Sequence, residues 1–249
     1  MMFKGLIVAV SLTLAVSPSL ALAGPLPEVS AGSGNPDYQW NAPYPEKNAA
    51  LAAVGDASAG EEAYKAYCAA CHLPSGGGNA DGSIPQLAGQ HRTVLIKQLA
   101  DIRAGLRANP TMYPLAIELS DAQALADVAT YIATLCIPRG AGQYEAPDAA
   151  KQIAYGKMLF EKDCGQCHGL NGDGMAEKFY PVLAGQHYAY LLRQLVDIRD
   201  GKRGNAHPEM VRLIAKYDNA QLVAISAYQA SLATRPRGWA TQPRFCSPE

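Results

Sequence analysis

The sequence lacks an excess of charge of either sign. It holds 21 Lys and Arg residues against 22 Asp and Glu residues, and charged residues make up only 17% of its 249 positions. Binding of nucleic acid through phosphate contacts needs a basic surplus, so the composition argues against a nucleic-acid-binding protein. A hydrophobic content of 49% argues equally against a chain that is disordered throughout.

Long apolar runs are also scarce, and the one run that could be a signal peptide or a membrane anchor lies at the N-terminus. Lys4 precedes an uncharged apolar stretch, and Ala21-Leu22-Ala23 has the small residues of an export cleavage site. We expect residues 1–23 to be a cleavable signal peptide that directs the chain to the periplasm, where disulfides persist. An uncleaved anchor is the alternative, although the run is short for a membrane span. No later segment predicts a spanning helix, so we do not expect an integral membrane protein, and docking on membrane complexes stays open.

Cysteine is scarce for a disulfide scaffold, with six residues in the chain, so each cysteine is interpreted by its position. Two C-x-x-C-H motifs use four of them: Cys68, Cys71 and His72, and Cys164, Cys167 and His168. Two thiols on one turn can each form a thioether with a porphyrin vinyl group, and the adjacent histidine then ligates the iron. The motifs predict two covalently bound haem c groups. A zinc site or a redox dithiol is the alternative, but zinc needs two more ligands near each pair and a dithiol needs no histidine.

The two motifs belong to an internal repeat with an offset of 96 residues. The segment PQLAGQHRTVLIKQLADIRAG begins at Pro85, and PVLAGQHYAYLLRQLVDIRDG begins at Pro181. These segments agree at 13 of 21 positions. The chain therefore contains two copies of one unit, which favours a tandem pair of domains over a solenoid of many short repeats.

Each unit is predicted to be helical, and the whole chain all-α. Apolar residues follow a helical period at 95, 99 and 102 and again at 191, 195 and 198. Ser58 with Glu61, Ser120 and Asp218 are expected to cap helices, and no alternating strand pattern is present. The expected parts are a signal peptide (1–23), an extended Pro/Gly-rich leader (24–54), a first domain (55–137), a linker (138–147), a second domain (148–234) and a Pro-rich tail (235–249).

The sixth ligand of each iron has to come from outside the motif. Met112 and Met210 are the only methionines that align between the copies, and each follows a nearby proline. A thioether opposite histidine favours ferrous iron and raises the reduction potential. Two packed core methionines are the alternative. His91 and His187 are rival ligands, and bis-histidine ligation would lower the potential. A role at the surface or beside the haem propionates is the more ordinary interpretation of these two histidines.

Pro85 and Pro181 each lie 13 residues after the attachment histidine. A carbonyl at this position could accept the histidine Nδ1–H and fix the ring, as groups behind metal ligands do. An ordinary loop proline is the equal alternative. Aromatic residues also repeat on the first and last helix of each unit, which predicts that they pack where those helices cross.

These combined motifs resemble the c4-type dihaem cytochromes c. The resemblance rests on two C-x-x-C-H domains, each followed by P-x-L-A-G-Q-H and a QL-x-DIR-x-G helix, and it covers roughly residues 59–232. It implies two cytochrome c domains related by a pseudo-twofold axis, with one haem in each. It also implies axial ligation by His72 with Met112 and by His168 with Met210.

The resemblance implies an electron carrier between redox proteins such as a donor dehydrogenase, a terminal oxidase or another cytochrome. A dedicated cytochrome subunit of a sulfide or thiosulfate dehydrogenase complex is the alternative, with the leader and tail as contact segments. A haem enzyme is the third possibility, and it would need an open or thiolate-ligated iron. The two methionines argue against an open iron, so we expect no catalytic residue.

Two further cysteines, Cys136 and Cys246, depart from the family pattern. Cys136 ends the last helix of the first domain, and Cys246 lies in the tail. An even count and an oxidising compartment favour a disulfide between them. The alternatives are a thiolate that ligates iron or carries sulfur, free thiols, or a bridge to a partner.

Overall fold

The computed structural model describes residues 40–139, 142–232 and 246. In this part of the chain there is no β-strand, and Met175 and Tyr180 form an isolated bridge. The predicted all-α fold is confirmed. The signal peptide, most of the leader and most of the tail lie outside the described residues. Within the described ranges, none of the helices has the length and apolar character needed to cross a membrane.

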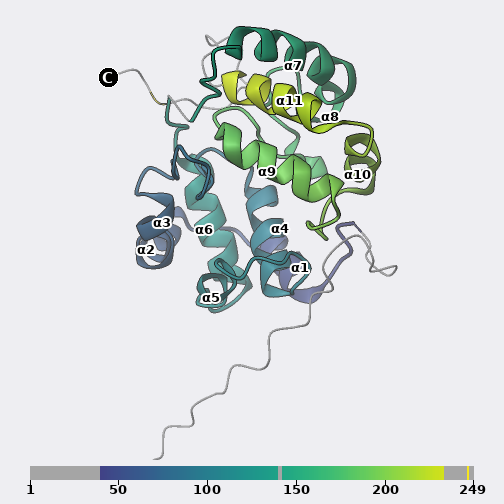
Figure 1. Cartoon of the computed structure of the whole chain (residues 1–249). Helices are drawn as coiled ribbons and strands as arrows, with labels where there is room; N and C mark the ends of the chain where they lie inside the picture. Colours follow the sequence, from purple (N-terminus) through teal and green to yellow (C-terminus); the bar gives the residue numbers. More distant parts are fainter. Residues whose placement is uncertain (1–39, 140–141, 233–245, 247–249) are drawn as a thin grey trace, which may run out of the picture.

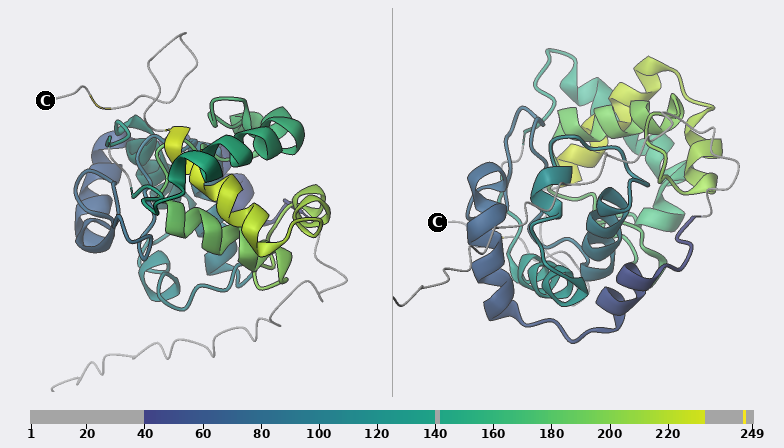
Figure 2. Two further views of the ribbon diagram at one scale, coloured as in Figure 1. Left: turned by 45° about the horizontal axis from the view of Figure 1, so that its top comes forward. Right: turned by 90° about the horizontal axis from the view of Figure 1, so that it is seen from below.

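The helices repeat in the same order in two units. The first unit contains α1 (Pro45–Ala52), α2 (Ala57–Tyr67), α3 (Ala69–His72), α4 (Arg92–Arg103), α5 (Tyr113–Ala116) and α6 (Ala122–Thr134). The second contains α7 (Ala149–Asp163), α8 (Gly165–His168), the 3-10 helix η1 (Ala176–Lys178), α9 (Tyr188–Arg199), α10 (Pro208–Ile214) and α11 (Asn219–Ser231). Helices α2 to α6 therefore correspond to α7, α8, α9, α10 and α11. Figures 1 and 2 show the units as two lobes, the first blue to teal and the second green to yellow.

The leader is not extended throughout, as the sequence suggested, because α1 forms within it. Pro45 opens this helix, where its fixed φ suits the first turn and its missing N–H costs nothing. Ala50 is fully buried and joins the core of the first lobe, against α4 and α6. This tertiary contact stabilises an eight-residue helix that is too short to be stable alone.

Two predicted helix caps are wrong by one or two residues. Helix α2 is capped by Asp56, whose Oδ1 accepts from the backbone N–H of Ser58 at 2.8 Å. Helix α6 is capped by Asp121 and not by Ser120. In both cases a neighbouring carboxylate takes the cap, and its charge also suits the positive end of the helix dipole. Asp218 caps α11 as predicted, within a capping box.

Helices α2 and α6 of the first lobe, and helices α7 and α11 of the second, each cross at an aromatic pair and a glycine. Ring centroids lie 5.4 Å apart for Tyr64 and Tyr131, and 5.3 Å apart for Phe160 and Tyr228. The predicted aromatic packing is confirmed. A Cβ at Gly156 would lie 1.8 Å from the carbonyl oxygen of Ala224, so α7 and α11 approach more closely than any larger residue allows.

We therefore expect Gly156→Ala to lower the free energy of unfolding by about 1–3 kcal/mol or more, because the clash is with rigid backbone. Denaturant unfolding of the holoprotein measures this change. Gly165→Ala is the matched control, since its Cβ would approach closely only the flexible Leu170 side chain, at 2.7 Å, while the Phe160 carbonyl oxygen lies at an ordinary 3.6 Å. The first motif already has Ala69 at the equivalent position. Equal losses for both variants would contradict the explanation.

Candidate haem sites

Each C-x-x-C-H motif forms a short helical turn that continues directly from the first long helix of its lobe. Cys68 is both the last cap of α2 and the first cap of α3, and the His72 N–H donates to its carbonyl at 2.9 Å. The turn leaves Cys71 exposed and buries His72 to 4% exposure. In the first motif one thiol, that of Cys71, is therefore accessible while the histidine is buried, an arrangement that fits attachment of a porphyrin.

Both attachment histidines are fixed by a proline carbonyl. The Nδ1 atom of His72 lies 3.0 Å from the carbonyl oxygen of Pro85, and that of His168 lies 3.3 Å from the carbonyl oxygen of Pro181. Burial lowers the pKa of both histidines, and the carbonyl contact opposes this effect. A neutral ring that donates through Nδ1 keeps the lone pair of Nε2 for iron. The arrangement fits the haem chemistry that the motifs predict.

Glycines let the following loop close around this contact. Gly78 has φ +64°, and its N–H donates to the His72 carbonyl at 3.0 Å. A Cβ there would lie 2.6 Å from the Pro85 carbonyl oxygen, the atom that holds the histidine. Gly174 repeats the arrangement at Pro181, also with 2.6 Å. The Gly-rich loops thus set the distance between the histidine and its acceptor.

The first thiol of each motif does not have the lowered pKa of a redox dithiol. Burial raises the pKa of Cys68 to about 11 and that of Cys164 to about 12, so both stay protonated at neutral pH. Reactive dithiols need a lowered pKa. A zinc site has no support either, because the described ranges bring no three His, Cys, Asp or Glu side chains together as metal ligands.

The two aligned methionines lie in matching places between the second and last long helices of their lobes. Met112 is the N-cap of α5, and its N–H donates to Asn109 Oδ1 at 3.1 Å. Met210 lies in α10 and packs against the apolar cluster of α9 and α11. Both side chains are half-buried.

His91 and His187 bind the opposite lobe. His91 Nε2 lies 2.8 Å from the carbonyl oxygen of Asp173, and His187 Nε2 lies 2.7 Å from that of Gly77, the position 96 residues earlier. Nδ1 of His187 also accepts the N–H of Gly142 at 3.0 Å. Both rings therefore join the lobes, and this geometry disfavours bis-histidine ligation.

The preceding glutamines cross the same interface in a reciprocal way. Gln90 accepts the N–H of Val182 at 2.8 Å and donates to its carbonyl at 3.0 Å. Gln186 does the same to Gln86, at 3.0 Å and 2.9 Å. Residue 86 corresponds to residue 182, so the contacts follow the pseudo-twofold axis. This role was not predicted from the sequence, although the Gln-His pair repeats at the same offset of 96 residues.

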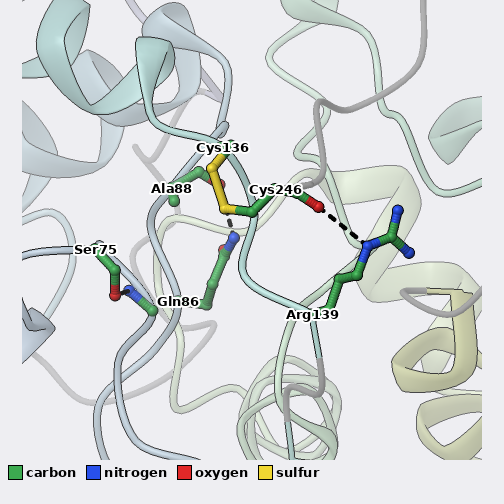
Figure 3. The surroundings of a disulfide bond; sticks show 7 residues. Ser75, Gln86, Ala88, Cys136, Arg139 and Cys246 are labelled. Atoms are coloured by element: carbon green, nitrogen blue, oxygen red, sulfur yellow. Dashed lines mark hydrogen bonds between the residues drawn. A yellow bond between two sulfur atoms is a disulfide. The ribbon is translucent and has the colours of Figure 1, made fainter. Parts of the chain in front are cut away.

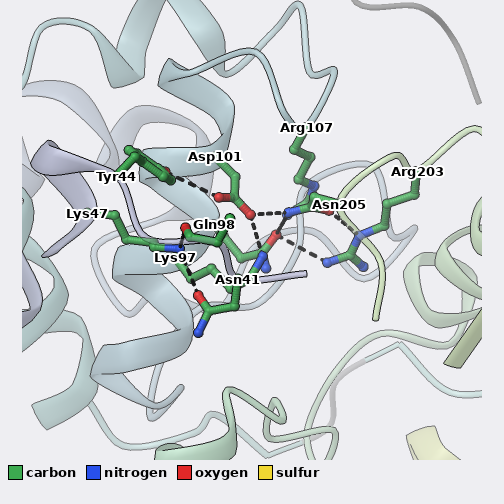
Figure 4. Close-up of polar contacts among 10 residues, drawn as sticks. Asn41, Tyr44, Lys47, Lys97, Gln98, Asp101, Arg107, Arg203 and Asn205 are labelled. Carbon is green, nitrogen blue, oxygen red and sulfur yellow. Dashed lines mark hydrogen bonds and ion pairs between the residues drawn. The ribbon is translucent and has the colours of Figure 1, made fainter. Parts of the chain in front are cut away.

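A polar cluster extends the interface (Figure 4). The Gln98 side-chain oxygen accepts from Arg107 at 2.8 Å, from Arg203 at 3.2 Å and from Asn205 at 3.1 Å. Asn205 also donates to Asp101 at 2.7 Å. Side chains of both lobes are thus joined through amide groups, which can donate and accept at once.

The described part of the leader is tied into this cluster. The Tyr44 hydroxyl donates to Asp101 at 3.2 Å, and Lys97 forms a buried ion pair with the same carboxylate. Burial lowers the pKa of Lys97 to about 8. Its ammonium lies 4.1 Å from the centre of the Trp40 ring, which in turn packs 4.9 Å from the His207 ring of the second lobe. The leader therefore contacts both lobes.

Cys136 and Cys246 are joined by a disulfide, with Cα atoms 4.9 Å apart (Figure 3). The N–H of Cys246 donates to the Ile137 carbonyl at 2.9 Å, and Arg139 Nε donates to the Cys246 carbonyl at 3.1 Å. The bridge and its two hydrogen bonds fix one point of the tail beside the end of the first lobe. Neither sulfur is free as a thiolate in this structure.

Two haem-attachment turns with carbonyl-held histidines, one in each of two matching lobes, define a dihaem c-type cytochrome. Residues 153–233 match the Cytochrome c family, and residues 55–132 match the family described as Cytochrome C oxidase, cbb3-type, subunit III. The chain is 39% identical over 184 residues to cytochrome c4 of Pseudomonas aeruginosa, covering 71% of this chain and 88% of that protein. The chain belongs to the cytochrome c4 family.

Solved structures agree with this assignment. The crystal structure of reduced recombinant cytochrome c4 from Pseudomonas stutzeri matches with a TM-score of 0.60 at 35% identity, over 70% of this chain and 97% of that one. The chain is also 34% identical over 176 residues to the thiosulfate dehydrogenase electron acceptor of Stutzerimonas stutzeri, covering 69% of this chain and 81% of that protein. The predicted family, the two cytochrome c domains, the two covalent haem c groups and the electron-transfer role are confirmed.

Proposed function

We propose that this protein is a periplasmic electron carrier that accepts electrons from a donor dehydrogenase and delivers them to a terminal oxidase or another acceptor. The observation that carries the proposal is the pair of buried histidines, His72 and His168, each held through Nδ1 by a proline carbonyl in lobes that bind each other directly. When bound, each haem supplies one-electron chemistry at iron without making or breaking a substrate bond. The chain itself would orient His72 and His168 toward the irons through the two proline carbonyls.

Met112 and Met210 are proposed as the sixth ligands. Their matching places in the two lobes, half-buried in the segment before the last helix, support this role. His91 and His187, the rival ligands, already have partners across the interface. With both axial positions filled, neither iron would be open to a substrate, so the proposal contains no enzymatic activity.

A dedicated role as electron acceptor of a thiosulfate dehydrogenase is the second candidate. It is favoured by the similarity to the Stutzerimonas stutzeri acceptor, whose name states that function. A carrier in this role would need a lasting contact with the dehydrogenase. Binding of the holoprotein to a purified thiosulfate dehydrogenase, compared with its binding to a terminal oxidase, distinguishes the two candidates.

Ligation of the irons is the first test of the proposed function. EPR and near-infrared magnetic circular dichroism of the ferric holoprotein are expected to show two low-spin haems with histidine and methionine ligands. A bis-histidine haem would contradict the proposed methionine ligands, and a high-spin or thiolate-ligated haem would contradict a simple electron carrier. That iron would then be the place to look for catalysis.

A further inference from the structure

The peptide group between Pro85 and Gln86 is hydrogen-bonded on both sides. Its carbonyl oxygen lies 3.0 Å from His72 Nδ1, and its N–H donates to the side-chain oxygen of Gln186 at 3.0 Å. The Gln86 side chain does not compete for this N–H, because it bonds to the Ala88 carbonyl at 2.7 Å (Figure 3). A continuous path of polar groups therefore runs from the histidine of the first lobe to a glutamine of the second.

The second lobe has the same path in reverse. In the peptide group between Pro181 and Val182, the carbonyl oxygen lies 3.3 Å from His168 Nδ1. The N–H of the same peptide group donates to the side-chain oxygen of Gln90, in the first lobe, at 2.8 Å. The same arrangement occurs in both lobes at equivalent positions, 96 residues apart, which indicates that it belongs to the fold and is not a chance contact.

The orientation of each glutamine follows from the backbone. A peptide N–H can only donate and a carbonyl can only accept, so the amide oxygen of Gln90 has to face the N–H of Val182 and its NH2 group the carbonyl. Gln186 is 7% exposed, so its hydrogen bonds to Gln86 are shielded from water. Polar groups in such surroundings polarise one another more strongly than they do in solvent.

We propose that each glutamine is a positioning residue that adjusts the reduction potential of the haem in the opposite lobe. An acceptor on the peptide N–H makes the peptide oxygen a better acceptor for the histidine Nδ1–H. This gives the histidine more anionic character, which favours ferric iron and lowers the potential. The proposal rests on the proposed function, since it assumes that His72 and His168 ligate the irons.

The path also links the two lobes chemically. The peptide group whose carbonyl holds His72 donates its N–H to Gln186, and the peptide group whose carbonyl holds His168 donates its N–H to Gln90. Any motion that opens the interface removes both bonds together. Contact between the lobes thus lowers both potentials relative to separated lobes, apart from any effect of water.

The test is Gln90→Met, which keeps the length of the side chain and removes its acceptor and donor. The equilibrium constant for reduction of the second haem is expected to rise about threefold, or about 30 mV at 59 mV per tenfold change for one electron. The first haem is expected to change less. Proton NMR during a redox titration follows the two haems separately, and Met112→His and Met210→His variants assign the signals.

Thr93→Val is the matched control. The Thr93 hydroxyl donates across the same interface, to the Ala176 carbonyl at 2.6 Å, but it does not touch the peptide that holds His168. It is expected to leave both potentials unchanged. A loosened interface that only admits water would favour ferric iron and lower the potential in Gln90→Met, opposite to the expected sign.

The mirror variant Gln186→Met should raise the potential of the first haem, and it keeps the proposal testable if Gln90→Met does not fold. A fall in potential, no shift, a larger shift in the glutamine's own lobe, or an equal shift in Thr93→Val would each overturn the proposal. Failure of the proposed function has a different signature, because the wild-type protein would then lack two haems with histidine and methionine ligands.

Discussion

Replacing Met210 by histidine is expected to lower the reduction potential of the second haem by on the order of 0.2 V, within the range of about 0.8 V that axial ligands span. A thioether stabilises ferrous iron, whereas a second imidazole donates more strongly and stabilises ferric iron. Met210 is half-buried beside α9 and α11, so a histidine there would be held in place and would not swing into water. Spectroelectrochemistry of the holoprotein measures the shift.

Met158→His is the control for this experiment. Met158 is 64% exposed on α7 and has no methionine at the equivalent position of the first lobe, so its replacement should change neither potential. The near-infrared charge-transfer band should report the loss of one methionine ligand in Met210→His only. An unchanged band and potential in Met210→His would show that another residue ligates the iron.

The local chemistry of the haem sites could be predicted from the sequence because it depends on short spacings. The C-x-x-C-H turns need only four residues of helix after Cys68 or Cys164, and the prolines lie 13 residues further on. A loop of this length can return the carbonyl to the ring, but only the structure distinguishes this from an ordinary loop proline. The repeat added a second, independent instance of each spacing.

Contacts between distant segments could not be predicted in the same way. Gln90 and Val182 are 92 residues apart, and nothing in either segment alone indicates a partner. The repeated Gln-His pair suggested a ligand role for the histidines, because a histidine near a haem motif is chemically plausible as a ligand. Only the arrangement of the lobes shows that these side chains face backbone groups of the opposite unit.

The structure of the leader also depends on contacts with distant segments and could not be predicted from its sequence alone. Its composition is rich in proline and glycine, which favours an extended chain, yet α1 forms because Ala50 finds a buried place against α4 and α6. The placement of Trp40 between Lys97 and His207 likewise depends on both lobes being folded. Local propensity therefore decided little where a short segment gains most of its stability from tertiary contacts.

The second large effect is expected on stability, from the double variant Cys136→Ser/Cys246→Ser. The disulfide closes a sequence separation of 110 residues that contains the whole second lobe. Its removal gives the unfolded chain more freedom, which in the chain-entropy model lowers the free energy of unfolding by about 4–5 kcal/mol, less any strain in the native bridge. Denaturant unfolding of the oxidised wild type and the double variant measures the difference.

The same variant separates a structural role of these cysteines from a redox role. Cys136 is exposed, so a reductant can reach the bridge, and the reduced wild type should unfold like the double variant while the oxidised form stays more stable. Both haem potentials should be unchanged, because the bridge fixes the tail beside Ile137 and touches neither attachment histidine. A difference in the free energy of unfolding below about 1 kcal/mol would contradict a stabilising role of the disulfide, since closing a loop of this size is expected to contribute several times more. A shifted haem potential would instead indicate that these cysteines act on a haem iron.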